Sequence, residues 1–179
     1  MMEDIKEVLL SEEDIIQKVK EMGSIISNDY RGKNLVVVGV LKGSVIFAAE
    51  LIKRITIPCE IDFMAVSSYG NATESSGVVW ILKDLAHSIE GKDILIVEDI
   101  VDSGVTLSYL TKYLKARKAN SIEIVTLLNK PARRKKDIYV KYIGYDVPDE
   151  FIVGYGIDYA EKYRNLPFIG ILKPEVYDK

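Results

Sequence analysis

The sequence ILIVEDIVDSGVT, residues Ile94–Thr106, decides the fold. Its first four residues are all apolar, which is typical of a strand buried on both faces of a parallel sheet. Three acids and a Ser-Gly turn follow, and Leu107, Leu110 and Leu114 then recur at the spacing of a helix. The segment therefore predicts a buried strand with an acidic tip, a loop of small residues and a helix.

The acids and the loop indicate which kind of ligand this segment binds. Ligands of open parallel sheets bind beyond the carboxyl ends of the strands. A loop of small residues that enters a helix presents free backbone N–H groups to an anion, typically a phosphate. Carboxylates would repel a phosphate unless they serve another part of the ligand, such as sugar hydroxyls or magnesium. A helix N-cap would explain one acid of the three, so we expect a phosphate site beside a sugar or metal site.

The stretch Val97–Thr106 resembles the motif that binds 5-phosphoribosyl 1-pyrophosphate (PRPP) in type I phosphoribosyltransferases, especially in the branch that uses 6-oxopurines. The resemblance extends from about Leu35 to Pro174. It implies an α/β fold in which a central, mostly parallel sheet is flanked by helices and carries a small hood and a flexible lid loop. It also implies a single phosphoribosyltransferase domain over residues 1–179, with the hood built from the N-terminal and C-terminal segments.

Within the resemblance, this motif supplies the PRPP site and the catalytic base. Glu98 and Asp99 match the acids that bind the ribose hydroxyls, and both are candidate magnesium ligands. Asp102 is the candidate general base, which would take a proton from N7 of the purine. The residues matched to the loop around the PRPP 5′-phosphate are Asp102, Ser103, Gly104, Val105 and Thr106.

Two further segments match the family's site for pyrophosphate. Leu41, Lys42 and Gly43 match a loop in which the peptide bond after the residue matching Leu41 can be cis. Arg164 matches an arginine that contacts the pyrophosphate. The resemblance thus implies that backbone N–H groups and one guanidinium share the charge of the leaving pyrophosphate.

A polar stretch rich in Gly and Ser matches the family's mobile lid, which would span about residues 67–82 here. Ser68 and Tyr69 match the residues at its start. A lid suits this chemistry because a reactive ribosyl cation has to be shielded from water. Trp80 and Ala86 depart from the pattern expected of close relatives, and neither replaces a residue that the chemistry needs.

The purine site is implied by Lys130 and by the segment Pro148–Tyr159. Lys130 matches the lysine that donates to the exocyclic oxygen at purine C6. Phe151 would stack on the base, and the backbone around Ile152 would contact its Watson–Crick edge. Asp158 belongs to the same segment and would bind magnesium, directly or through water. A fixed donor at Lys130 favours 6-oxopurines over adenine, whose 6-amino group is also a donor.

Hydrophobic periodicity predicts the other helices and strands. Ser11 followed by acids is typical of a helix N-terminus. The basic run Arg133–Lys136 is expected to be an exposed turn, with an RNA-binding patch as the less favoured interpretation. The elements expected are helices over 11–28 and from after 44 to about 54, and strands over 35–41, 60–66, 78–82, 122–128 and 139–145.

Composition favours one globular domain in a reducing compartment. Hydrophobic residues make up 48% of the 179, enough for a sizeable core. The net charge of −3 gives no electrostatic argument for nucleic-acid binding. A single cysteine, Cys59, excludes an internal disulfide. Acids stand where a signal peptide would be basic, and no apolar run is long enough to span a membrane, so we expect a cytoplasmic protein without membrane partners.

The resemblance implies a magnesium-dependent enzyme of purine salvage. It would transfer the 5-phosphoribosyl group from PRPP to N9 of hypoxanthine or guanine. Family members are commonly dimers or tetramers, so a homo-oligomer is expected by analogy. The main alternative is a non-catalytic regulator of the same fold that senses PRPP or a nucleotide. A uracil phosphoribosyltransferase that binds RNA and an unrelated nucleotide-binding domain are less favoured, because the acid pair, base, stacking aromatic and pyrophosphate arginine occur together.

Overall fold

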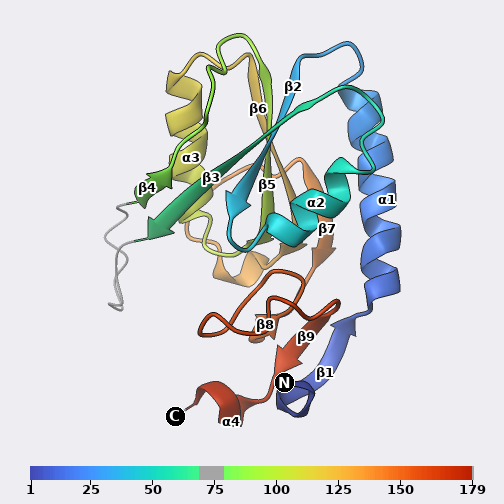
Figure 1. The fold of residues 1–179 in the computed structure, drawn as a ribbon. Helices are drawn as coiled ribbons and strands as arrows, with labels where there is room; N and C mark the ends of the chain where they lie inside the picture. Colours follow the sequence, from blue (N-terminus) through green and yellow to red (C-terminus); the bar gives the residue numbers. More distant parts are fainter. Residues whose placement is uncertain (69–78, 179) are drawn as a thin grey trace.

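The structure is a computed structural model that describes residues 1–68 and 79–178 (Figure 1). The strands of the described residues form a six-stranded sheet, in the order β4-β3-β2-β5-β6-β7, and a three-stranded sheet, in the order β1-β9-β8. The strands are β1 (Ile5–Leu10), β2 (Leu35–Leu41), β3 (Glu60–Ser68), β4 (Val79–Lys83), β5 (Asp93–Val101), β6 (Ser121–Asn129), β7 (Tyr142–Asp146), β8 (Ile152–Val153) and β9 (Ile169–Leu172). The helices are α1 (Glu12–Asp29), α2 (Val45–Ile52), α3 (Val105–Ala116) and α4 (Pro174–Tyr177), with 3-10 turns at Met2–Asp4 and Pro131–Arg133.

β5 lies at the centre of the larger sheet, where it pairs in parallel with β2 and β6. Its apolar run serves both faces of the sheet. Ile94 and Ile96 belong to one hydrophobic core, Leu95 and Val97 belong to the other, and all four are fully buried. α1 and α2 cover one face and α3 covers the other (Figure 1). The predicted strand that is buried on both faces is therefore confirmed.

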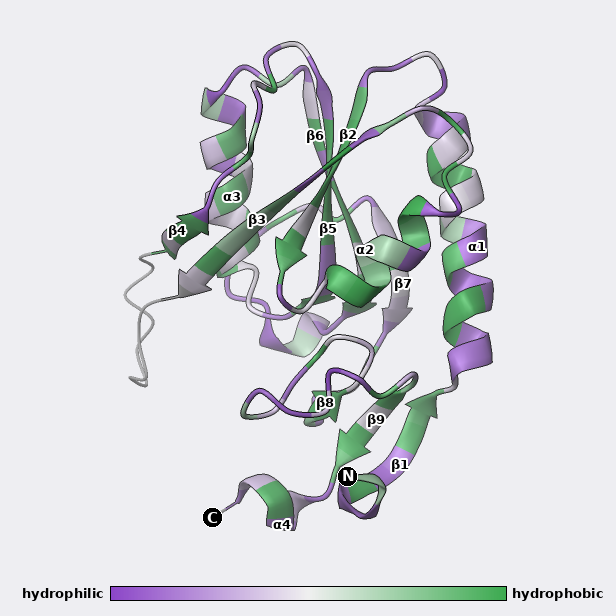
Figure 2. Ribbon diagram, in the orientation of Figure 1, coloured by the Kyte–Doolittle hydropathy of each residue, from purple (hydrophilic) through white to green (hydrophobic). Residues whose placement is uncertain are grey.

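The larger sheet is mostly parallel, as the sequence predicts. β2 pairs in parallel with β3, and β6 with β7, whereas β4 is antiparallel to β3 at one edge. The helix expected over 11–28 is α1, and Ser11 is its N-cap: the Asp14 N–H donates to Ser11 Oγ at 3.1 Å. Figure 2 shows α1 with alternating hydrophobic and hydrophilic bands. Its apolar residues Ile15, Val19 and Met22 are buried in the core, whereas the polar residues Gln17, Lys20 and Glu21 between them are exposed.

The three-stranded sheet joins the two ends of the chain. β1 pairs antiparallel with β9, which pairs antiparallel with β8. A small core of its own holds this sheet together, with Val153, Leu166 and Leu172 buried in it. Both termini lie on this part of the molecule, on the side towards which β2 and β7 point (Figure 1). This sheet is the small hood of the expected fold class.

Several boundaries differ from those that the sequence predicts. β5 continues to Val101 because its ladder with β6 runs on past Val97, so Glu98 and Asp99 lie within the strand and not beyond it. α2 ends at Ile52, about two residues early, and the strand expected over 139–145 begins at Tyr142. Tyr69 and most of the expected lid lie outside the described residues, while the backbone of residue 68 ends β3.

The two positions that depart from the family's pattern lie on or near the edge strand β4. Trp80 belongs to β4 and is 57% exposed. The Ala86 N–H donates to the Asp62 carboxylate at 2.8 Å. Neither position lines the crevice described below. In the parts of the chain that the structure describes, no helix has the length and apolar character needed to cross a membrane.

Candidate active site

Two adjoining cavities lie where β2, β5 and β6 end and the hood begins. Ile100, Asp102 and Asp158 line both cavities. One cavity is also lined by the acid pair, Glu98 and Asp99, and by residues of the phosphate loop, Asp102–Thr106. The other is also lined by Lys130 and Phe151. The carboxyl ends of parallel strands thus form a crevice, as the general rule for open sheets predicts.

The loop between β5 and α3 is built to receive an anion. Gly104 has a φ of 77°, a backbone conformation that glycine adopts without strain. The N-cap residue Gly104 has no side chain that could cap α3, and the Val105 N–H makes one long hydrogen bond to Ser103 Oγ, at 3.4 Å, so an anion can compete for the first N–H groups of the helix. Ser103 and Thr106 line the cavity beside these groups. This geometry favours a phosphate at the position that the sequence predicts.

The acid pair Glu98 and Asp99 forms the floor of the same cavity. Desolvation, reinforced by the neighbouring charge of Asp99, raises the pKa of Glu98 well above its ordinary range. Burial raises the pKa of Asp99 in the same way. Gly43 approaches this pair so closely that a Cβ built on it would collide with the Asp99 carboxylate. Bound hydroxyl groups or a cation would favour the ionised forms of both acids.

Arg164 brings a positive charge from the hood to this cavity. Its Nη1 donates to the Gly156 carbonyl at 2.8 Å, and its Nη2 lies 3.0 Å from Asp158 Oδ1. Its Nε is buried and has no hydrogen-bond partner among the described residues. A buried donor of this kind needs an acceptor, and a phosphate oxygen in the cavity would supply one.

Lys42 lies at the edge of the crevice. The peptide bond between Leu41 and Lys42 is cis. The Lys42 ammonium lies 2.8 Å from Glu161 Oε2, on the hood, and its side chain is 68% exposed. Leu41 and Gly43 line the cavity, whereas Lys42 does not. The backbone of this loop, more than the lysine side chain, therefore faces the ligand space.

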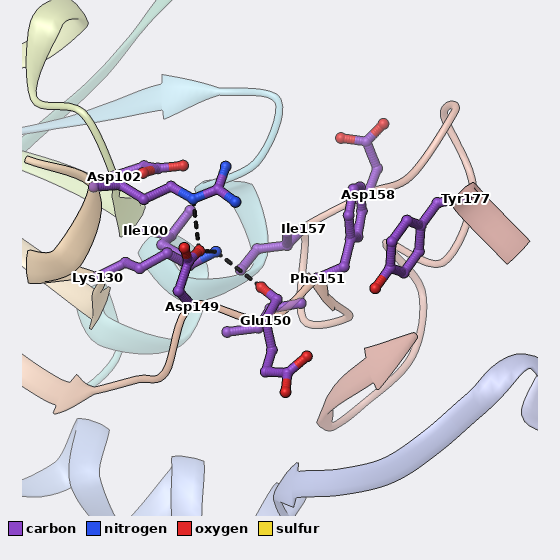
Figure 3. Close-up of a pocket in the computed structure, with 11 residues that line it drawn as sticks. Ile100, Asp102, Lys130, Asp149, Glu150, Phe151, Ile157, Asp158 and Tyr177 are labelled. Atoms are coloured by element: carbon purple, nitrogen blue, oxygen red, sulfur yellow. Dashed lines mark hydrogen bonds and ion pairs between the residues drawn. The ribbon is translucent and has the colours of Figure 1, made fainter. Parts of the chain in front are cut away.

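The second cavity is lined by Lys130, Phe151, Ile152 and Asp158, the residues that the resemblance assigns to the purine site (Figure 3). Lys130 Nζ donates to the Glu150 carbonyl at 2.9 Å and lies 3.9 Å from Asp149. Burial lowers the pKa of Lys130, while the Asp102 carboxylate opposes that shift. Lys130 comes from the end of β6 and Phe151 from the start of β8, so the gap between sheet and hood separates them.

Phe151 is held by other aromatic rings. The Tyr177 ring stacks on it with centroids 4.7 Å apart, and the Tyr159 ring meets it edge-on at 5.2 Å. In Figure 3, Phe151 lies between Tyr177 on one side and Ile100 and Lys130 on the other. One ring face is therefore supported from the C-terminal helix α4, while the other faces the space in which a base would stack.

The crevice brings together most of the residues that the sequence predicts. The residues that line it are Leu41, Gly43, Glu98, Asp99, Asp102, Ser103, Gly104, Thr106, Lys130, Phe151, Ile152, Asp158 and Arg164. Val105 is the first residue of α3. The side chains of residues 68 and 69 are outside the described part of the chain.

Sequence reasoning missed several residues that line the purine cavity. Ile100, Asp149, Ile157 and Tyr177 all contribute to its wall. Ile100 could have been found, because it is an apolar residue of the same motif and directly follows the acids Glu98 and Asp99. No local pattern marks Tyr177, which lies 26 residues after Phe151 in the sequence and reaches it through the fold of the hood.

The carboxylates of the crevice fit magnesium better than a metal held by protein ligands alone. No group of three or more His, Cys, Asp or Glu side chains among residues 1–68 and 79–178 is arranged to hold a metal ion. Glu98, Asp99 and Asp158 nevertheless line one cavity and offer the hard oxygen donors that magnesium prefers. Magnesium commonly uses one or two carboxylates together with substrate phosphates and water, so this donor set fits an ion that arrives with a phosphorylated ligand.

Comparison with known proteins gives consistent matches over the whole chain. A family model described as "Phosphoribosyl transferase domain" matches residues 7–160. The hypoxanthine-guanine phosphoribosyltransferase of Staphylococcus epidermidis is 62% identical over 179 residues and is covered completely, as is this chain. A crystal structure of a hypoxanthine phosphoribosyltransferase from Staphylococcus aureus superposes with a TM-score of 0.98 at 60% identity, covering 100% of this chain and 97% of that one. A structure of a Trypanosoma cruzi hypoxanthine phosphoribosyl transferase superposes with a TM-score of 0.94 at 40% identity, and the match covers 98% of this chain and 95% of that one.

Proposed function

Because the chain belongs to the phosphoribosyltransferase family, we infer that it is a purine-salvage enzyme. It transfers the 5-phosphoribosyl group from PRPP to N9 of hypoxanthine or guanine and so produces IMP or GMP and pyrophosphate. The observation that carries this proposal is the meeting of two cavities at Asp102, one with a phosphate loop and acid pair and one with a lysine and a stacking aromatic.

In the proposed complex, the loop from Asp102 to Thr106 holds the 5′-phosphate of PRPP. Backbone N–H groups at the start of α3 and the hydroxyls of Ser103 and Thr106 are the donors. Glu98 and Asp99 accept hydrogen bonds from the ribose 2′- and 3′-hydroxyls. Their negative charge also suits a transition state in which positive charge develops at C1′.

The pyrophosphate leaves from the side of the crevice next to Gly43 and Arg164. The bond from C1′ to the pyrophosphate oxygen breaks, and its electron pair leaves with that oxygen. Arg164 carries the unpartnered Nε that the leaving group would engage, and the backbone of the loop Leu41–Gly43 adds N–H donors. When bound by Glu98, Asp99 or Asp158, magnesium would neutralise charge on the pyrophosphate and make it a better leaving group.

The purine binds between Phe151 and Ile100. Lys130 donates to the oxygen at C6, and the backbone around Ile152 contacts the Watson–Crick edge. As the bond from N9 to C1′ forms, Asp102 takes the proton that the purine loses at N7. Asp102 suits this role because it lines both cavities and therefore lies next to both substrates.

The remaining features of the proposal concern the whole protein. We propose that residues 1–179 form one domain, that the segment 67–82 with Ser68 and Tyr69 acts as a lid, and that the enzyme is cytoplasmic. We also propose a homo-oligomer, dimer or tetramer. Exposed apolar side chains on α2, Val45 and Ile46, support a contact between copies.

A turnover assay with PRPP and magnesium tests the proposal. Hypoxanthine, guanine, xanthine and adenine are offered separately, and nucleotide formation is followed with and without magnesium. We expect turnover with one or more 6-oxopurines, little with adenine, and none after chelation of magnesium. Magnesium-dependent binding of PRPP without turnover of any base would instead identify a PRPP-sensing regulator.

A further inference from the structure

The basic run Arg133–Lys136 is not a uniform exposed turn. Lys135 and Lys136 expose their side chains, but their backbone N–H groups both donate to the Ser103 carbonyl, at 2.9 and 3.1 Å. Arg133 is exposed and pairs with Asp149. Arg134 alone in this run is half-buried. The segment that carries the run therefore packs directly against the phosphate loop.

Residues 130–136 donate hydrogen bonds to three consecutive carbonyls, that of the last residue of β5 and those of the first two residues of the loop after it. The Lys130 N–H donates to the Val101 carbonyl at 2.9 Å. Arg134 Nε donates to the Asp102 carbonyl at 3.2 Å. The Ser103 carbonyl accepts the two N–H groups of Lys135 and Lys136. Backbone N–H groups make the hydrogen bonds to the Val101 and Ser103 carbonyls, whereas a side chain makes the one to the Asp102 carbonyl. A substitution can therefore remove the hydrogen bond to Asp102 selectively.

Arg134 is itself held in place from the other side. Its Nη2 donates to Asn129 Oδ1, and Asn129 Nδ2 donates to Asp146 Oδ1 at 2.7 Å. Asn129 is 8% exposed. The stem of Arg134 packs against Gly104, because a Cβ built on Gly104 would lie 3.2 Å from Arg134 Cδ. A planar guanidinium can bind two acceptors at once in a fixed geometry, and here it links the ends of β6 and β7 to the loop after β5.

This link bears on the position of the Asp102 carboxylate. Asp102 Oδ1 is buried without a hydrogen-bond partner among the described residues. Since no described residue holds this oxygen by a hydrogen bond, the position of the carboxylate depends largely on the position of the Asp102 backbone. We propose that Arg134 is a positioning residue for proton transfer: by holding the Asp102 carbonyl, it fixes the carboxylate at the purine. The proposal rests on the role of Asp102 in the proposed function.

Two substitutions at position 134 test the proposal, with a matched control in the same run. Arg134→Met removes both hydrogen bonds, and Arg134→Lys retains the charge but can donate to one acceptor well and not to both. We expect Arg134→Met to lower kcat by up to about 100-fold, as misplacement of a reacting group by about 1 Å can do, with the KM values little changed. Arg134→Lys should recover part of that loss.

Lys135→Met is the control, because it removes one exposed positive charge near the same loop and leaves the backbone N–H in place. It should have wild-type kcat. An equal loss in Lys135→Met would overturn the proposal and assign the effect to the electrostatic field. Retention of wild-type kcat by Arg134→Met would overturn it as well.

A double-mutant cycle with Asp102→Asn separates positioning from general damage to the fold. If Arg134 acts through Asp102, Arg134→Met should cost little further kcat once the base has been removed. Additive losses would contradict the proposal and indicate a structural role, and thermal unfolding of each variant shows whether it is folded. If Asp102→Asn alone has wild-type kcat, the proposed base is wrong, which is a different failure from that of Arg134.

Discussion

Asp102 is the residue that we propose as the general base. It lines both cavities of the crevice, and its Oδ1 is buried with no donor bound to it in the described part of the chain. Glu98 and Asp99, four and three residues earlier, line the cavity that contains the loop Asp102–Thr106 and not the cavity that contains Lys130. In the proposed function, the three acids of one motif therefore serve two different parts of the reaction.

Asp102→Asn keeps the size and shape of the side chain but removes the proton acceptor. We expect kcat with hypoxanthine to fall by about 10²–10⁴-fold, the range typical of general-base catalysis. The KM values for PRPP and the purine should stay near those of the wild type. Steady-state kinetics at saturating magnesium measures both, and an unchanged kcat would remove Asp102 from the role of base.

Lys130→Met tests the recognition of the oxygen at C6. Hydrogen bonds to charged groups contribute about 1.5–3 kcal/mol, so kcat/KM for hypoxanthine should fall by about 10- to 100-fold. The kcat/KM for adenine should fall less, because adenine has no oxygen at C6 that could accept a hydrogen bond from Lys130. An assay in which hypoxanthine and adenine compete for the enzyme measures the ratio of their kcat/KM values. Equal losses for both bases would show that Lys130 supports the fold of the site and not its selectivity.

At the scale of elements, the hood and the larger sheet divide the site between them. β5 and β6 supply the acids, the phosphate loop and Lys130, while the hood supplies Phe151, Asp158 and Arg164. α4 then supports Phe151 from behind through Tyr177. The short C-terminal helix is therefore part of the proposed purine site, although it lies far from the motif in the sequence.

Tyr177→Ala tests this support by α4. Aromatic pairs contribute about 0.5–1.5 kcal/mol beyond their buried area, so loss of the ring should raise KM for the purine by about twofold to tenfold. KM for PRPP should not change, because Tyr177 does not line the PRPP cavity. Tyr177→Phe keeps the stacked ring and is the control. A rise in KM for the purine in Tyr177→Phe would assign the effect to the hydroxyl instead.

At the scale of the whole molecule, two carboxylates join elements that are distant in the sequence: that of Asp84, which is exposed, and that of Asp93, which is buried. Asp84 binds Tyr113 and Arg117, and Asp93 accepts from Asn120 and Ser121. Burial opposes the ionisation of both acids, but these hydrogen bonds and nearby positive charges outweigh it, so the pKa of each lies below its ordinary value. Both carboxylates therefore stabilise the folded state in their ionised forms.

The pH dependence of stability follows from the sign of these shifts. A group whose pKa is lowered on folding stabilises the protein above its unfolded pKa and loses that contribution as pH falls towards the folded pKa. We expect the unfolding temperature to fall as pH drops below about 4. Asp93→Asn should be less stable at neutral pH and show a shallower fall in acid. Equal pH profiles for the two proteins would mean that Asp93 does not contribute to the acid sensitivity.

Sequence alone determined the fold class, the central strand and most of the crevice. The run Ile94–Val97 indicates burial on both faces by its composition, and the loop Asp102–Thr106 predicts a phosphate site by its small residues at a helix start. Both are properties of a short stretch of chain, and local backbone preference and burial decide them. The family resemblance then placed Lys130, Phe151, Asp158 and Arg164.

Tertiary structure alone decided what supports these residues. Nothing near Tyr177 or Arg134 in the sequence indicates a partner, and the basic run around Arg134 is typical of an exposed turn. Tyr177 meets Phe151 because β9 returns the chain beside β8, and Arg134 meets Asp102 because β6 ends next to β5. Such contacts depend on which strands become neighbours, and that is settled only when sheet and hood pack together over their shared crevice.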